Sequence, residues 1–385
     1  MIAMIFGSKA KDKAILMISV QSSIVRVTIV HLSKSQLPLI LFNSSKFIKQ
    51  RDDVDANYLV KATTNHISEG VDEALKEFHA MRHADMRLPH SISEVHFVLS
   101  SPWIASHARK LSKAFSKPAA ITSKGIKEMI SGERSKYLAI DSSRQDIVEE
   151  KIFDIRLNGY SIPEWEGKMA NSMDISFATS VVGKAVIERF EEACAHVVHK
   201  NNVHFHSSLL LHHIGTQQIL PNKASYVLVH IHGELTDVVI VDQQMCVFFG
   251  SFSRGINTVV RSIAHAMQTS DSMADSYLTM YLSGKTVPDA DRKSIDIIQD
   301  VQRGWMGEFL KLLKNSGYTG YIPESVMISS RIHEPFFIDS YKKKYPNAEV
   351  EIVTKEMLSV GVKYAPKAEQ LRVLGLYAIA LNIIA

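Results

Sequence analysis

The sequence has little cysteine and little excess of charge of either sign. Its 385 residues contain two cysteines, Cys194 and Cys246, too few for a disulfide framework or a four-cysteine zinc site. We expect both to be packed apolar residues, since no local pattern of a catalytic thiol surrounds them. The 44 Lys and Arg against 40 Asp and Glu give a net charge of +4, too mild to indicate a nucleic-acid-binding protein.

Long apolar runs are also missing. The first ten residues lack the apolar core and cleavage site of a secretory signal. The most apolar stretch, Leu371 to Ala385, contains Arg372 and Asn382 and is shorter than the roughly 20 residues that a membrane-spanning helix needs. It predicts a buried helix or strand end. The composition is that of ordinary globular domains, and the length predicts two or three of them.

Alternating β-branched residues open the chain and recur in its second half. Ala14 to His31 predicts two strands joined by a tight turn at Gln21-Ser22-Ser23, and a helix follows from Asn57 to Met81. The second half repeats this order, with strands at Ala224 to Val241 and Gln244 to Phe252 and a helix at Asn257 to Met267. The weak internal duplication predicts an α/β protein of two related lobes.

A small α+β unit is predicted between these blocks. It contains a short helix at Thr122 to Ser131 and strands at Asp146 to Leu157 and Met173 to Ala178. A helix with Ser180 as its N-cap then runs to Val198.

Four segments stand out by their order and spacing. They are SVQSSIVR (Ser19 to Arg26), YVLVHIHGELTDVVIV (Tyr226 to Val241), SFSRGINTVVRSIA (Ser251 to Ala264) and VMISSRIHEPFFIDSY (Val326 to Tyr341). Together they resemble the FtsA and PilM branch of the actin-like ATPase superfamily, and the resemblance covers nearly the whole chain. The first two are similar to the phosphate motifs D-I-G-[ST]-S-S-[VI]-K and v-v-D-I-G-G-G-T-T-D-v; Gly233, Thr236 and Asp237 match the second. The last segment stands where the adenosine motif would be.

The resemblance implies a two-lobed actin-like fold, a duplicated ribonuclease H-like α/β architecture with an inserted small α+β subdomain. The first lobe would be residues 1–90, completed by 178–222 and 365–385. The inserted subdomain would be 91–177, with its first strand in Ser93 to His107. The second lobe would be 223–364, with a reduced upper subdomain because only a short Pro-Asp loop lies between Gly284 and Lys293.

The residues that would form the nucleotide cleft differ from those of the family. They are Ser19, Gln21, Ser22, Ser23, Arg26, His230, His232, Gly233, Asp237, Ser329 and Ser330. Glycine lets a backbone approach phosphate oxygens, and Gln21 and His232 place side chains there instead. Magnesium prefers carboxylate ligands, and Ser19 and His230 replace them. Ser329 and Ser330 replace both glycines of the purine site.

We therefore expect no catalytic residue, no metal site and no cofactor, with residual ATP and Mg²⁺ binding at most. Arg26 is expected to be a solvated strand-end residue rather than a phosphate ligand. Lys342-Lys343-Lys344 is expected to be a solvated helix face rather than a patch for an anionic lipid or an acidic partner. Six histidines invite a zinc interpretation, but no carboxylate or cysteine is spaced to complete the site, so we expect them to be hydrogen-bonded or exposed. They are His204, His206, His212, His213, His230 and His232.

The resemblance implies a scaffold or adaptor on the cytoplasmic face of the membrane, non-catalytic or weakly nucleotide-binding. One relative recruits the cell-division polymer, and the other grips the cytoplasmic tail of a pilus inner-membrane protein. The sequence ends directly after the fold without a basic amphipathic helix, so we expect the protein to contact the membrane through partners. For the same reason we favour a PilM-like adaptor in type IV pilus assembly over an FtsA-like one in cell division. We also expect self-association and no binding of nucleic acid. The alternative is an active ATPase with atypical phosphate-binding residues.

Overall fold

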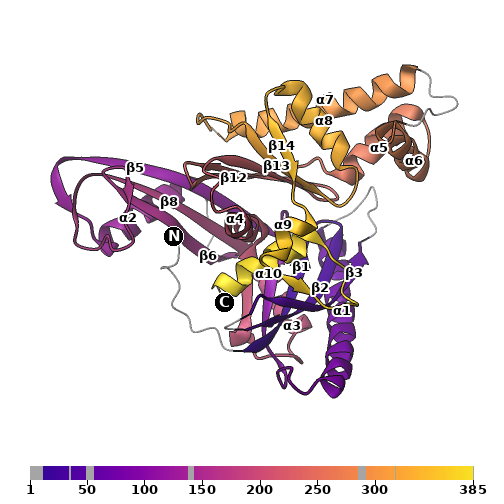
Figure 1. Ribbon diagram of the computed structural model, residues 1–385, viewed down its shortest axis with the longest axis horizontal. Coiled ribbons are helices and arrows are strands. Elements are labelled where there is room, and N and C mark those ends of the chain that lie inside the picture. Colours follow the sequence, from indigo (N-terminus) through magenta and orange to yellow (C-terminus); the bar gives the residue numbers. More distant parts are fainter. Residues whose placement is uncertain are drawn as a thin grey trace. The chain divides into compact units, whose positions relative to one another are not determined.

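The computed structural model describes residues 12–33, 36–48, 56–137, 143–284, 292–316 and 318–384 (Figure 1). The chain divides into two compact units. The first contains residues 1–223, 243–248 and 354–385, and the second residues 224–242 and 249–353. The predicted Pro-Asp loop, residues 285–291, lies outside the described residues.

The first unit is built on a six-stranded sheet in the order β15-β3-β2-β1-β4-β9. Its strands are β1 (Lys13–Val20), β2 (Ile24–Leu32), β3 (Leu39–Phe47), β4 (Ile92–Leu99), β9 (Val203–Ser207) and β15 (Lys363–Tyr364). β1, β2 and β3 are antiparallel neighbours, whereas β4 runs parallel to β1, and β9 parallel to β4. Nearly every residue of β1 and β2 is buried, which is typical of inner strands covered on both faces.

Helices pack against this sheet. α1 (Ala56–Ala84) and α3 (Lys184–Ala193) contribute Ile67, Phe78 and Phe190 to one core with Leu16 and Phe97 of the sheet. Also in this unit, α4 (Ser208–Ile219) and α10 (Arg372–Ile384) pack together, and residues 373–381 are all buried. A Cβ at Gly215 of α4 would lie 2.5 Å from the Leu376 carbonyl oxygen, so glycine permits this close approach. The predicted buried helix near residue 371 is confirmed.

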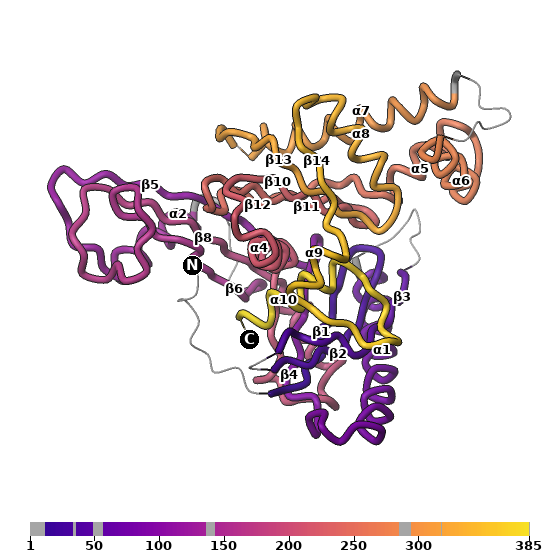
Figure 2. The backbone as a smooth tube through the Cα atoms, viewed as in Figure 1, coloured from indigo at the N-terminus to yellow at the C-terminus, as the bar shows by residue number. Residues whose placement is uncertain are grey.

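The same unit holds a second, four-stranded antiparallel sheet in the order β5-β8-β6-β7, whose long strands can be followed in Figure 2. Its elements are β5 (Ile104–Ala120), α2 (Ser123–Tyr137), β6 (Gln145–Leu157), β7 (Tyr160–Ser161) and β8 (Met169–Gly183). Ile126 and Ile130 of α2 pack with Ile155 and Phe177 in a separate small core. These elements lie where the sequence predicted an inserted α+β subdomain, and the sheet with its helix is called the inserted subdomain below.

Two sequence predictions near this subdomain are wrong. The strand predicted to open it, within Ser93 to His107, is β4, which instead lies between β1 and β9 in the six-stranded sheet. The helix predicted from Ser180 begins at Lys184, because β8 continues to Gly183 and Ser180 pairs with Ser106 of β5. Pairing on both sides of β8 extends the strand past the local helix signal.

The second unit contains a five-stranded sheet in the order β12-β11-β10-β13-β14. Its strands are β10 (Tyr226–Ile231), β11 (Thr236–Asp242), β12 (Met245–Phe252, of which residues 245–248 count with the first unit), β13 (Ser325–Ser330) and β14 (Glu349–Ile352). Its helices are α5 (Ile256–Met267), α6 (Asp271–Leu282), α7 (Arg292–Asn315) and α8 (Glu334–Lys344). Trp305 of α7 contacts both Phe252 and Phe337, which anchors the helices on the sheet. Two short helices, η1 (Lys200–Asn202) and α9 (Lys355–Ser359), belong to the first unit.

The duplication predicted from the sequence appears in the strand order. Five strands of the first sheet, β3-β2-β1-β4-β9, are matched by β12-β11-β10-β13-β14 in the second. The pair β1 and β2 is antiparallel, as is the pair β10 and β11, and parallel strands follow on the other side of β1 and β10. The two units therefore share one topology.

Candidate functional site

The turn between β10 and β11 is the second predicted phosphate hairpin. His230 stands opposite Asp237 in the antiparallel register. The His232 backbone N–H donates to the Leu235 carbonyl at 2.8 Å, which closes the turn. The His230 and His232 rings meet edge to face, with centroids 4.2 Å apart. Two imidazoles therefore line this hairpin.

Asp237 is held by two protein side chains. His232 Nε2 donates to Asp237 Oδ2 at 2.7 Å, and Ser251 Oγ donates to Oδ1 at 2.6 Å. The His232 and Asp237 side chains are 1% and 2% exposed. The carboxylate lies between the hydroxyl and the imidazole, so Ser251 is not activated as in a serine hydrolase, where the imidazole is central. The arrangement is a buried hydrogen-bonded network.

Glu234 occupies a family glycine position and binds the first turns of α5. Its carboxylate accepts hydrogen bonds from Asn257 Nδ2 at 2.9 Å and Thr258 Oγ1 at 3.2 Å, and pairs with Arg261. An anion is favoured at a helix N-terminus, and at the start of α5 the Glu234 carboxylate is that anion. A Cβ at Gly255 would lie 2.5 Å from the carbonyl oxygens of His232 and Gly233, so the hairpin and α5 are tightly packed.

Ser329 and Ser330, at the predicted adenosine position, end β13 beside β10. Ser329 pairs in register with His230, and the Ser329 hydroxyl lies 3.1 Å from His230 Nδ1. Ser330 Oγ donates to the Ile332 carbonyl at 2.8 Å, and the Ser330 N–H donates to Glu334 at 3.2 Å. The structure thus brings His230, Asp237 and Ser329 together in one unit.

The first predicted phosphate hairpin, β1 and β2, lies in the first unit. The Gln21 N–H donates to the Ile24 carbonyl at 3.0 Å, and the Gln21 carbonyl accepts from Trp103 Nε1 at 3.2 Å. Gln21, Ser22 and Ser23 are all buried. The hydroxyls of Ser19 and Ser22 have no hydrogen-bond partner among the described residues.

Arg26 is buried, at 4% exposed, so the expectation of a solvated strand-end residue is wrong. It pairs in register with Ser19 on one side and Ser45 on the other. Arg26 is the third residue of β2, an inner strand with nearly every residue buried, so both faces of the sheet are covered even near the start of this strand.

No family model matches the sequence, and no curated protein matches it. Solved structures do. A PilM-PilN type IV pilus biogenesis complex is 13% identical and covers 98% of this chain and 98% of its own, with a TM-score of 0.63. The ethanolamine utilization protein EutJ from Carboxydothermus hydrogenoformans is 9% identical, and its match covers 98% of this chain and 92% of EutJ, with a TM-score of 0.42. A Bacteroides thetaiotaomicron protein with an actin-like ATPase fold is 8% identical, and its match covers 95% of this chain and 96% of that protein, with a TM-score of 0.38. The chain has the actin-like ATPase fold.

The residues at the nucleotide positions of this actin-like fold do not fit a magnesium ion. Ser19 and His230 stand where carboxylates were expected, and both oxygens of Asp237 already accept hydrogen bonds. Mg²⁺ needs oxygen ligands in octahedral geometry. Mg²⁺ at Asp237 would compete with two donors that already hold this carboxylate, and no second carboxylate was expected beside it, so we derive no step through the ion.

Other predicted features of the actin-like chain are distributed over both units. Burial raises the pKa of Cys194 to about 12 and that of Cys246 well above its usual value, and both are buried as predicted. Lys342-Lys343-Lys344 is exposed at the end of α8. The six histidines separate: His204 and His206 lie on β9, His212 and His213 on α4, His230 on β10, and His232 in the turn that follows β10.

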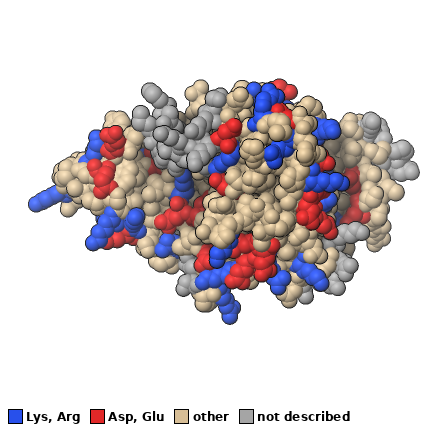
Figure 3. Space-filling view, turned by 90° about the horizontal axis from the view of Figure 1, so that it is seen from below, with Lys and Arg blue, Asp and Glu red and all other residues tan. Residues whose placement is uncertain are grey.

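Two further observations concern membranes and charged partners. None of the helices in the described ranges is long and apolar enough to cross a bilayer. The face shown in Figure 3 carries Lys and Arg side chains interspersed with Asp and Glu.

Sequence reasoning missed Ser251, which completes the Asp237 network from β12, and the role of Glu234 in holding α5. Ser251 lies in a different strand from Asp237, and no local spacing relates the two residues. Glu234 was visible in the sequence as a departure from the motif. Its partners Asn257 and Arg261 stand at helical spacing at the start of α5, after β12.

Proposed function

We propose that the chain is a PilM-like actin-fold adaptor that binds the cytoplasmic segment of a membrane protein and does not hydrolyse ATP. The proposal rests mainly on the buried network of His232, Asp237 and Ser251, since it engages the carboxylate of the second phosphate hairpin within the protein. The likeness to a PilM-PilN complex at a TM-score of 0.63 supports a scaffold of this kind. The adaptor would then lie on the cytoplasmic face of the membrane through its partner.

The partner is tested by cross-linking. The full chain, carrying a photoreactive residue in the inserted subdomain, is cross-linked in its native cells and the adducts are identified by mass spectrometry. We expect adducts with the cytoplasmic segment of a membrane protein. Adducts with a division polymer alone would support the FtsA-like alternative, and adducts with neither would contradict the adaptor role.

The inserted subdomain is the part of the first unit that we propose contacts partners and mediates self-association. Its outer strand β5 offers a sheet edge to which another strand can add. Ala108 and Ala178 are paired in register, so residues 109–177 can be removed and these ends joined by a two-residue turn. A join at His90 would instead remove β4 from the six-stranded sheet.

The shortened chain is expected to melt cooperatively and to lose partner capture and self-association. Retention of every interaction of the full chain would show that contacts lie elsewhere. Non-cooperative melting would show that the subdomain is needed for the core, and would equally contradict the assignment.

A second candidate function is an active ATPase with atypical phosphate-binding residues. It is favoured by the buried Ser19 and Ser22 hydroxyls, which lack partners among the described residues and could bond to a phosphate oxygen. Phosphate release from ATP and Mg²⁺ separates the two functions, because a scaffold that only binds ATP would raise its melting temperature without releasing phosphate.

A further inference from the structure

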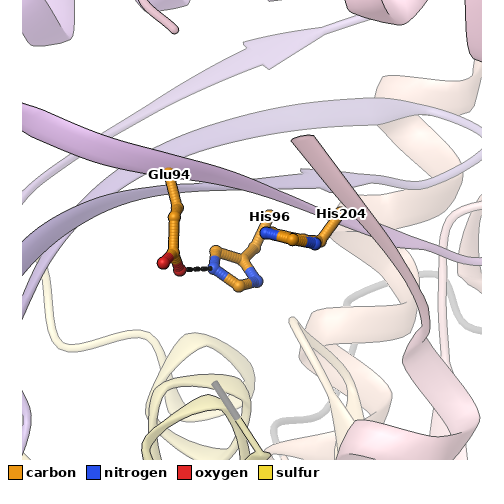
Figure 4. Close-up of side chains that lie close together, drawn as sticks. All are labelled: Glu94, His96 and His204. Atoms are coloured by element: carbon orange, nitrogen blue, oxygen red, sulfur yellow. Dashed lines mark hydrogen bonds and ion pairs between the residues drawn. The ribbon is translucent and has the colours of Figure 1, made fainter. Parts of the chain in front are cut away.

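A row of acidic and imidazole side chains lies on β4 and β9, the last two strands of the six-stranded sheet of the first unit, and ends at Glu149 of β6. Glu94 and His96 lie two residues apart on β4, and His204 and His206 two residues apart on β9, so each pair shares a face of the sheet. His96 is paired in register with His204, and their ring centroids are 4.8 Å apart. Figure 4 shows Glu94, His96 and His204 close together, with Glu94 in contact with His96.

The contacts along the row start and end at a carboxylate. Glu94 Oε2 lies 2.9 Å from His96 Nε2. His96 Nδ1 lies 3.0 Å from His206 Nε2, and His206 Nδ1 lies 3.4 Å from Glu149 Oε1. Glu149 is fixed in turn by the backbone N–H of Ser207 at 3.2 Å.

This row has more acceptors than its imidazoles can satisfy. A neutral imidazole carries one N–H and one lone pair, and a carboxylate only accepts. His96 and His206 therefore supply two protons for the three contacts that link Glu94, His96, His206 and Glu149. With both imidazoles neutral, one contact brings two lone pairs together, and either an added proton on one ring or a metal cation at that contact removes the conflict.

We propose that Glu94, His96 and His204 bind a divalent transition-metal ion of the zinc class. One ligand atom from each of the three residues lies within 4.8 Å of the others. Imidazole nitrogen and carboxylate oxygen are ligands that suit zinc and its neighbours, at about 2.0 to 2.2 Å from the ion, so the three side chains close around it. The ion takes the place of a proton between His96 Nε2 and Glu94.

The remaining residues of the row then orient the ligands. His96 donates its Nδ1–H to His206, and His206 donates its Nδ1–H to Glu149, so every acceptor in the row has a donor or the ion. Outer partners of this kind hold a metal-binding imidazole in position.

The ion can reach the site from a cavity in the same unit. The cavity has a volume of about 420 Å³ and is lined by His204 and His206 together with Glu149, Lys151 and Leu210. Three protein ligands leave the fourth position of a tetrahedral ion for water or a small anion from this side.

Lys13 is the competitor of the ion. Its Nζ lies 2.7 Å from Glu94 Oε2, so the ammonium group already neutralises the carboxylate. The ammonium group and the ion would share one carboxylate and repel each other, so a variant without this charge should bind metal more tightly.

The test uses the full chain, freed of metal by a chelator and titrated with Zn²⁺ by calorimetry and with Co²⁺ by visible absorption. We expect one equivalent to bind with nitrogen and oxygen ligation. His204→Gln and Glu94→Gln should weaken binding by at least about tenfold, and Lys13→Met should strengthen it. The matched control is His196→Gln, since His196 is an imidazole that pairs with Asp72 on the surface.

The absence of one-to-one binding to the wild-type chain would overturn the proposal, as would wild-type affinity in both His204→Gln and Glu94→Gln. If metal-free His204→Gln and Glu94→Gln melt at a different temperature from the metal-free wild type, their loss of binding could reflect altered folding. The metal affinity of Lys13→Met then tests the site. Unchanged or weaker binding in that variant then rejects the site. The inference is independent of the proposed adaptor function.

Discussion

His232 and Asp237 face each other inside the β10–β11 hairpin, with imidazole Nε2 2.7 Å from carboxylate Oδ2 and both side chains buried. The pair occupies the position at which the resemblance predicted a phosphate-binding turn. Its burial implies that the two residues now contribute to the stability of the second unit.

Asp237→Ala should therefore destabilise the protein. The variant removes the acceptor of the buried His232 Nε2 and of the half-buried Ser251 Oγ, and donors left without a lost carboxylate cost about 2 to 4 kcal/mol. Urea unfolding measures the change. Asp300→Ala, at an exposed ion pair with Arg303, is the control and should stay within about 0.5 kcal/mol of wild type. Equal stability of the two variants would contradict this role of Asp237.

The wild-type chain should show no magnesium-dependent phosphate release from ATP and no rise in melting temperature with ATP and Mg²⁺. The physical reason is that Ser19 and His230 offer no carboxylate and both Asp237 oxygens are engaged. A colorimetric phosphate assay and thermal melting check this. Release above the blank that disappears in Asp237→Asn would establish the ATPase alternative.

The double variant His230→Asp, His232→Gly should not gain ATP binding. It repairs one hairpin, while the Glu234 carboxylate remains on α5 and would repel a phosphate group. Gln21, Ser329 and Ser330 also remain. Calorimetric titration with ATP and Mg²⁺ is the measurement. Micromolar binding in this variant alone would show that the remaining residues do not block the site.

Gly255→Ala should be more destabilising than Gly307→Ala. An added Cβ at Gly255 meets the carbonyl oxygens of His232 and Gly233 at 2.5 Å, whereas one at Gly307 of α7 meets nothing within 4 Å. The first change forces the hairpin and α5 apart, at a cost of about 1 to 3 kcal/mol. The second improves helix propensity by up to about 1 kcal/mol. Thermal and urea unfolding of both variants should give opposite signs.

The protein should lose stability as the pH falls below about 6.5, in part through His213. Burial lowers the pKa of His213 from 6.5 to about 3, so the unfolded chain takes up a proton that the folded chain excludes. The contribution of this residue is fully present above pH 6.5 and decreases towards pH 3, by up to about 1.4 kcal/mol per pH unit. His213→Leu should flatten the pH dependence of the unfolding free energy over this window. An unchanged slope in the variant would show that His213 titrates normally in the folded state.

Much of the succession of strands and helices along the chain was predictable, because the hairpins alternate β-branched residues and the helices carry regular apolar stripes. β5 was missed. Its outer half is mostly exposed, and its sequence, SKAFSKPAA, lacks an apolar alternation. Such a strand is formed by pairing with β8 along its length, which no window of sequence contains.

The candidate site was predictable only as a set of positions. Motif order placed His230, Asp237 and Ser329 correctly in one unit, but the Ser251 contact with Asp237 depends on a neighbouring strand. The carboxylate beside His204 was missed in the same way, since Glu94 comes from a strand far earlier in the chain. The spacing of residues within one segment does not show which residues of another strand will lie beside them in the fold.

The packing of α10 on α4 against Gly215 has a consequence for synthesis on the ribosome. Residues 354–385 belong to the first unit, whereas the second unit is built mainly from residues 224–353. All residues of the second unit are therefore synthesised before the last residues of the first unit, although synthesis of the first unit begins earlier. The second unit can thus fold before the first is complete. Until residues 373–381 leave the exit tunnel, the apolar surface of α4 that they cover stays exposed, and a chaperone that recognises such surfaces would find it there.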